Sequence, residues 1–177
     1  MISRHPDFQA PITTDVIVGE LWLDWRDFAD NWGKFAKWRN NGVITVKPTD
    51  QIEAVWYRLY VIELAPAAAA AAKNWQRVEL STHDAWEKHG IRSWPWRPSK
   101  PILYRVPLAV RKLEAVLGLQ PRAGETAYLA HFRYRLDASP NAAFFPDVLP
   151  SPLSGREGLA LFRLWDDGWR LEELHLE

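Results

Sequence analysis

The sequence predicts an α+β fold, in which an antiparallel sheet is packed on one face by N-terminal amphipathic helices. Three observations carry this prediction. Residues 21–40 repeat apolar side chains at helical spacing, residues 125–137 alternate apolar with polar side chains, and Asp167-Gly168 joins two apolar runs in a hairpin. Helical patterns lie mostly early in the chain and strand patterns mostly late, so we expect helices to cover one face of the sheet.

The 177 residues favour a single globular domain, 1–177, since a compact unit of this size buries most of its apolar surface. Within it, residues 1–20 are expected as an N-terminal extension and residues 138–156, with their four prolines, as a long loop. Hydrophobic residues make up 47% of the chain and charged residues 25%, which argues against wholesale disorder and against a fibrous protein.

The absence of cysteine excludes disulfides, thiolate metal sites and thiol catalysis. The N-terminal residues contain no apolar leader region, and no window approaches the roughly 18 apolar residues that cross a membrane. We therefore expect a soluble, cytoplasmic protein without membrane contact, unless a leader peptide has been removed.

The segment 21–40, LWLDWRDFADNWGKFAKWRN, carries the strongest helical pattern. Its aspartates come early and its lysines and arginines late, as the helix dipole favours, and the Asn-Asn-Gly that follows is a typical helix end. The apolar positions at helical spacing are Trp22, Trp25, Ala29, Trp32 and Ala36.

Two strands are expected next, at 43–47 and 53–64, because both segments are rich in β-branched and aromatic residues. The second segment also fits a helical stripe, and Asp50 with Glu53 would form a capping pair at its start. We favour the strand, and the topology depends on this choice.

Two short helices follow. Pro66 and the six alanines after it predict a helix start, with a low-complexity linker as the alternative. Residues 81–89 predict a second helix, ended by Gly90.

The proline-rich stretch 91–105, IRSWPWRPSKPILYR, is expected to lack regular structure up to a short strand at 102–106. Residues 107–119, PLAVRKLEAVLGL, are expected as a helix that ends at Gly118. The positions at helical spacing are Leu108, Arg111, Lys112, Ala115 and Val116.

The segment 125–137 is expected as a half-buried strand. One face would carry Tyr128, Ala130, Phe132, Tyr134 and Leu136, and the other Leu129, His131, Arg133, Arg135 and Asp137. The hairpin that follows, with DDGWRLEEL, resembles the last two strands of nuclear-transport-factor-like and cystatin-like domains over about twenty residues. This resemblance implies, as an alternative fold, a cone-shaped sheet wrapped round a helix, and it carries no functional residue across.

Tryptophan and charge are unevenly distributed. Nine of the eleven tryptophans lie between Trp22 and Trp96. Residues 88–112 hold seven basic residues and no acidic one, whereas residues 157–177 hold six carboxylates against two arginines. Paired or solvated charges are the simplest interpretation, and binding of single-stranded nucleic acid to the basic segment is a less favoured alternative.

Two groups of residues are candidate binding sites. Trp94, Trp96 and Arg97 suit a protein contact, since tryptophan and arginine are enriched at interface hot spots, although either ring could instead pack into the core. The second group could line a cavity for an anionic small molecule or lie on the solvent face of the sheet, and consists of His131, Arg133, Arg135, Phe144 and Phe145.

No motif for catalysis, phosphate binding or a cofactor is present in the sequence. His83 and Glu87 lie one helical turn apart, which suits two metal ligands, but an ordinary solvated helix is favoured and no metal is expected. We therefore expect a non-catalytic domain that binds a protein partner. An enzyme or small-molecule site between the sheet and the helix from Trp22 to Trp38, with His131 and Arg133 as polar groups, is the alternative.

Overall fold

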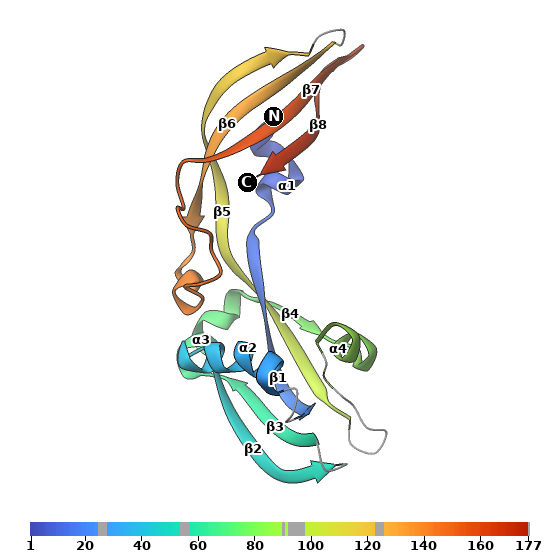
Figure 1. Ribbon diagram of the computed structural model, residues 1–177, viewed down its shortest axis with the longest axis vertical. Coiled ribbons are helices and arrows are strands. Elements are labelled where there is room, and N and C mark those ends of the chain that lie inside the picture. The colour runs from blue at the N-terminus through green and yellow to red at the C-terminus, as the bar shows by residue number, and fades with distance from the viewer. Residues whose placement is uncertain (25–27, 54–56, 90, 92–97, 123–125, 177) are drawn as a thin grey trace. The chain divides into compact units, whose positions relative to one another are not determined.

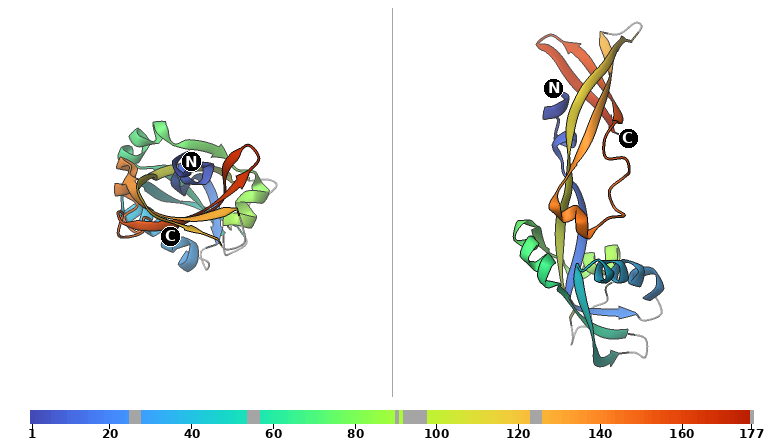
Figure 2. Two further views of the ribbon diagram at one scale, coloured as in Figure 1. Left: turned by 90° about the horizontal axis from the view of Figure 1, so that it is seen from above. Right: turned by 90° about the vertical axis from the view of Figure 1, so that its left-hand side faces the viewer.

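The computed structural model describes residues 1–24, 28–53, 57–89, 91, 98–122 and 126–176. It confirms the α+β class: helices accompany a mostly antiparallel sheet (Figures 1 and 2). The strands pair in the order β2-β3-β1-β5-β6-β7-β8, and β4 also pairs with β5. The strands are β1 (Ile12–Asp24), β2 (Ile44–Glu53), β3 (Tyr57–Leu64), β4 (Gln76–Glu79), β5 (Lys100–Pro121), β6 (Ala127–Ala138), β7 (Arg156–Trp165) and β8 (Gly168–Leu176). The α-helices are α1 (Pro6–Gln9), α2 (Phe28–Asn40), α3 (Pro66–Ala71) and α4 (Thr82–His89), and the 3-10 helices are η1 (Ile2–Arg4), η2 (Ala72–Asn74) and η3 (Pro140–Phe144).

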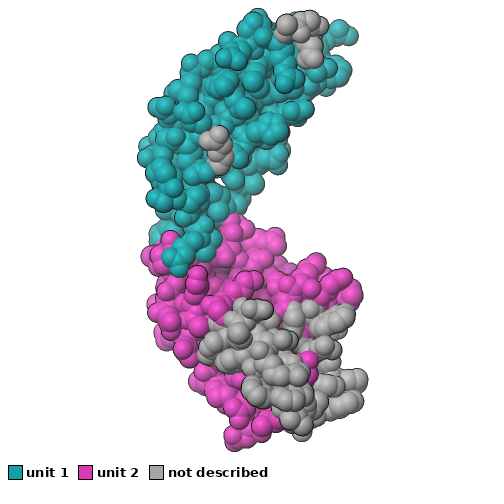
Figure 3. Space-filling model, in the orientation of Figure 1, with its two compact units in different colours: residues 1–12, 108–142, 147–177 teal, residues 13–107, 143–146 magenta. Residues whose placement is uncertain are grey.

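The chain forms two compact units, coloured separately in Figure 3. Unit 1 consists of residues 1–12, 108–142 and 147–177, and unit 2 of residues 13–107 and 143–146. Strand β5 begins in unit 2 and ends in unit 1. The expectation of one globular domain stays a prediction. No described helix is long and apolar enough to cross a membrane.

In unit 2 the predicted helix at 21–40 is only partly correct. Its C-terminal part is α2, but Leu21, Trp22 and Leu23 belong to strand β1, where they pair with β3. All three of these consecutive side chains are buried, which a strand covered on both faces achieves and an amphipathic helix does not. The backbone N–H of Trp22 donates to the hydroxyl of Ser99 at 3.1 Å, which links β1 to the start of β5.

Both expected strands of unit 2 form, as β2 and β3, although β2 continues to Glu53, where the second strand is expected to begin. The helical alternative for 53–64 is therefore wrong over 57–64. Residues 12–20, expected as part of an extension, are strand β1, and β4 is not predicted from the sequence. The alanine tract is helix α3, and residues 82–89 form helix α4.

In unit 1, strands β5 to β8 form an antiparallel sheet that curves around α1 (Figure 2). The segment 1–20, expected as an extension, contributes to this core: Ile2 and Phe8 are buried in one cluster with Phe132, Tyr134 and other side chains of the sheet. Phe8 meets the rings of Phe132 and Tyr134 edge-on at 6.2 and 6.0 Å, so the N-terminal residues cover part of the sheet as a second layer.

The predicted helix at 107–119 is wrong, because these residues continue strand β5 along β6. The register shifts between Leu113 and Ala115 and again between Val116 and Gly118, so an extra residue lies in the strand at each place. Leu113, Val116 and Leu119 therefore face the same side at intervals of three residues, as on a helix. The two bulges explain why the sequence pattern is misleading.

The C-terminal half otherwise follows the prediction. Strand β6 forms, and β7 and β8 form the hairpin, with Trp165 opposite Gly168. The described loop between β6 and β7 contains only the short helix η3. Packing of helix 21–40 on this sheet, and the cone-shaped alternative, stay predictions.

Candidate functional site

The first predicted site, Trp94, Trp96 and Arg97, lies outside the described residues. The basic segment around it is described in part, and four of its seven cations already have partners. An ion pair of this kind lowers the charge available to a phosphate backbone, and hydrogen bonds to carbonyl oxygens occupy the donors of Arg111. The partners are Lys88–Asp84 at 2.9 Å, Lys100–Glu20 at 3.4 Å, Arg105–Asp15 at 3.4 Å, and Arg111 with the carbonyl oxygens of Asp7 and Ala10 at 3.2 and 2.8 Å.

His131, Arg133 and Arg135 share the predicted polar face of β6, and each of the two arginines has a carboxylate partner. Arg133 lies opposite Glu157 on β7, with Nη2 and Oε1 3.4 Å apart. The Nε of Arg135 donates to Oδ1 of Asp137 at 2.7 Å. This arrangement supports the solvent-face interpretation of these residues.

Phe144 and Phe145 belong to unit 2, whereas the polar face of β6 belongs to unit 1. Phe145 is buried, and the carbonyl oxygen of Phe144 accepts a hydrogen bond from Nδ2 of Asn41 at 3.2 Å. Both aromatic residues therefore help to build unit 2, and a cavity lined by all five residues stays a prediction.

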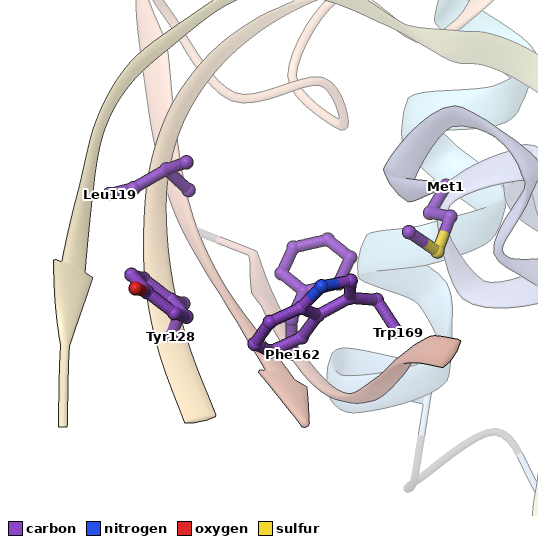
Figure 4. A pocket seen from close by; sticks show the side chains of 5 residues that line it. All are labelled: Met1, Leu119, Tyr128, Phe162 and Trp169. Atoms are coloured by element: carbon purple, nitrogen blue, oxygen red, sulfur yellow. The ribbon is translucent and has the colours of Figure 1, made fainter. Parts of the chain in front are cut away.

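The structure shows a different candidate site, a hollow of about 480 Å³ in unit 1 (Figure 4). Its described lining is apolar or aromatic and contains no charged side chain, so it suits an uncharged apolar group. The lining residues are Met1, Leu119, Tyr128, Phe162 and Trp169.

Four of the five lining side chains come from one face of the sheet, and Met1 precedes η1. Tyr128 of β6 lies opposite Phe162 of β7, Leu119 of β5 lies opposite Ala130, and Trp169 of β8 lies opposite Leu164. These sheet residues therefore share the face of the buried Phe132. Phe8 of helix α1 packs on Phe132 and Tyr134, and Tyr128 is not part of this buried cluster. The same face that forms the core under α1 is therefore exposed farther along the strands.

This exposed region is larger than the hollow itself. Leu119 is 60% exposed and Trp169 is 39% exposed, and the ring of Trp169 meets that of Tyr128 edge-on at 5.3 Å. Val116 and Leu164 on the same face are also exposed, whereas Phe162 is partly buried against the core. Together these side chains form what we call the apolar end surface, which consists of Met1, Val116, Leu119, Tyr128, Phe162, Leu164 and Trp169.

The motif HDAWEKH forms helix α4 as predicted, with Nε2 of His83 3.3 Å from Oε2 of Glu87. Both side chains are exposed, and within the described part of the chain no group of three metal-binding side chains is found. The hydroxyl of Ser81 bonds to Asp84 and, with Lys88, holds the pKa of that carboxyl below its usual range. The helix is thus an ordinary capped and solvated one.

Burial lowers the pKa of His89 at the end of α4, and the Lys34 ammonium lowers it further. Since the unfolded state then binds more protons than the folded state, we expect the free energy of unfolding to fall as the pH drops below about 6.5. Urea denaturation at a series of pH values should show that the free energy of unfolding depends less on pH in His89→Gln than in the wild type. Equal pH dependence of the free energy of unfolding in His89→Gln and the wild type would contradict the prediction.

The chain matches no protein-family model, no curated protein and no solved structure.

The sequence pattern correctly places Tyr128 on the same side of β6 as the buried Phe132. It does not predict that this side is exposed at Tyr128. The available signals were Trp169 directly after the hairpin turn and the apolar run Val116 to Leu119. Both were assigned to regular elements, so neither indicated a surface.

Proposed function

We propose that the protein is a non-catalytic binding domain that recognises a protein partner through the apolar end surface of unit 1. The supporting observation is that a sheet face, buried under α1 at Phe132, exposes Leu119, Tyr128 and Trp169 farther along. Contiguous apolar patches of this kind mark interaction sites, and tryptophan and tyrosine are common anchors in them. The segment with Trp94, Trp96 and Arg97 is a proposed second contact, and a soluble, cytoplasmic location is part of the same proposal.

A matched pair of variants tests this function. Leu119→Glu places a charge on the apolar end surface, whereas Val110→Glu makes the same change on the opposite face of β5, at a residue that is 49% exposed and pairs with Asp137. Proteins captured from source cells by the wild type would be purified, and their affinities measured by calorimetry. We expect Leu119→Glu to weaken binding about tenfold or more, because the buried charge loses its water, and Val110→Glu to bind like the wild type.

Equal affinities of the two variants would contradict the proposal, since the contact would then lie elsewhere. Circular dichroism and thermal melting of both variants would first show that each keeps the wild-type fold.

A second candidate function is the binding of a small, uncharged apolar molecule in the hollow. Its volume of about 480 Å³ supports this, because small-molecule sites usually measure roughly 300–1,000 Å³. This molecule would bind on the face of β6 opposite His131 and Arg133, so the anionic ligand that those residues suggested is not part of the proposal.

A further inference from the structure

The turn that follows helix α2 contains an asparagine directly before a glycine, Asn41-Gly42. The chain has five asparagines, and of these only Asn41 precedes a glycine. In such a pair the backbone nitrogen of the glycine can attack the side-chain carbonyl carbon of the asparagine and close a five-membered ring. A side chain on the second residue hinders this attack, whereas glycine has no Cβ. The pair therefore favours loss of the side-chain amide of Asn41.

The folded protein leaves both residues accessible. Asn41 and Gly42 are exposed to solvent in unit 2. Apart from its chain neighbours, no described atom lies within 4 Å of the position that a Cβ of Gly42 would take. The turn thus has space for the ring and for the water molecule that later opens it.

Two hydrogen bonds oppose the attack. The backbone N–H of Gly42 donates to the carbonyl oxygen of Arg39 at 3.0 Å, which holds the nitrogen in the turn. The Nδ2 of Asn41 donates to the carbonyl oxygen of Phe144 at 3.2 Å, which fixes the side-chain amide. Since the residues of the turn are exposed, each bond contributes little to stability and opens locally without unfolding of the chain. The fold therefore slows the reaction and does not block it.

We propose that Asn41 is a site of spontaneous deamidation in the folded protein. The nitrogen of Gly42 loses its proton and forms a bond to Cγ of Asn41. The bond between Cγ and Nδ2 breaks, and the side-chain nitrogen leaves as ammonia with that proton. Water then adds to either carbonyl carbon of the ring, which leaves aspartate or isoaspartate at position 41.

The reaction changes a contact within unit 2. A carboxylate accepts hydrogen bonds and donates none, so the bond to the carbonyl oxygen of Phe144 is lost. The new negative charge also lies beside the carbonyl end of α2, which the helix dipole disfavours. Deamidation therefore loosens the attachment of residues 143–146 to the end of α2.

Storage of the full chain at neutral pH and physiological temperature, followed by mass spectrometry of its proteolytic peptides, tests this proposal. We expect the peptide with Asn41 to gain the mass of deamidation before the peptides with the other four asparagines, and to contain both aspartate and isoaspartate. The same chain unfolded in guanidinium chloride should react about tenfold to hundredfold faster, because neither hydrogen bond forms there.

Asn41→Gln is the matched control, since it keeps the amide but requires a less favourable six-membered ring, and its peptide should stay intact. Asn41→Asp reproduces one product and should lower Tm by about 2–4 °C, because the bond to Phe144 is lost. Another asparagine that reacts as fast, or an Asn41 that reacts only in the unfolded chain, would overturn the proposal. An unchanged Tm of Asn41→Asp would overturn the loosening of residues 143–146.

Discussion

Gly19→Ala is expected to lower the free energy of unfolding of unit 2 by about 3–5 kcal/mol. Gly19 lies in β1 with a φ of 123°, a backbone conformation that side chains other than glycine rarely adopt. A Cβ atom there would lie 2.1 Å from the carbonyl oxygen of Lys100, at the start of β5. Because the clash is with backbone, relieving it requires β1 and β5 to separate.

Chemical denaturation followed by tryptophan fluorescence measures this effect, since nine of the eleven tryptophans lie in residues 22–96. Gly33→Ala is the matched control. A Cβ at Gly33, in helix α2, would meet nothing within 4 Å, so that variant should gain up to about 1 kcal/mol from helix propensity. A Gly19→Ala protein as stable as the wild type would show that the close approach of β1 to β5 is incorrect.

Phe132→Ala is expected to destabilise unit 1 by about 3–5 kcal/mol, the usual cost of removing a buried phenylalanine ring. Phe132 is fully buried and contacts the rings of both Phe8 and Tyr134. Its loss would leave a cavity under α1 and release the N-terminal residues from the sheet. Hydrogen exchange of the β6 and β7 amides measures the effect within unit 1, and Leu119→Ala, at a mostly exposed side chain, should change it by less than about 0.5 kcal/mol.

A double-mutant cycle with Gly158 tests the packing argument itself. A Cβ at Gly158 would lie 2.5 Å from Cζ of Phe132 and 2.8 Å from the carbonyl oxygen of His175, so Gly158→Ala alone should cost about 1–3 kcal/mol. In the Phe132→Ala background this cost should shrink, because one of the two clashes is gone. Strictly additive costs would show that the ring does not lie over Gly158.

The elements that the sequence predicts best are those whose pattern and neighbours agree. The alternation predicted for 125–137 appears over 127–137 as strand β6 with the expected faces, because one side of this paired strand is mostly buried and the other is in contact with water. The hairpin expected at Asp167-Gly168 also forms, with Asp166 and Asp167 in the turn and Gly168 beginning β8 at a φ of 121°. The residues within each segment are sufficient to predict both elements.

Two elements could not be predicted from local pattern. Trp22 fits the helical stripe predicted for residues 21–40, yet pairing with β3 places Leu21, Trp22 and Leu23 in a strand. Residues 107–119 also fit a helix, but bulges at their contacts with β6 produce the same spacing in a strand. In each case the partner strand decides the conformation, and no residue within the segment identifies that partner.

The candidate site shows the same division. Composition and pattern alone determined the α+β class, the sides of β6, the hairpin, and the absence of any thiol chemistry. They could not show where the core ends, because Tyr128 and Phe132 occupy equivalent positions in the alternating pattern. Only the tertiary structure shows that Ile2 and Phe8 cover Phe132 and that Tyr128 is exposed to solvent. Burial depends on how far a covering layer extends across a sheet, and that extent is a property of the packed chain rather than of any residue in it.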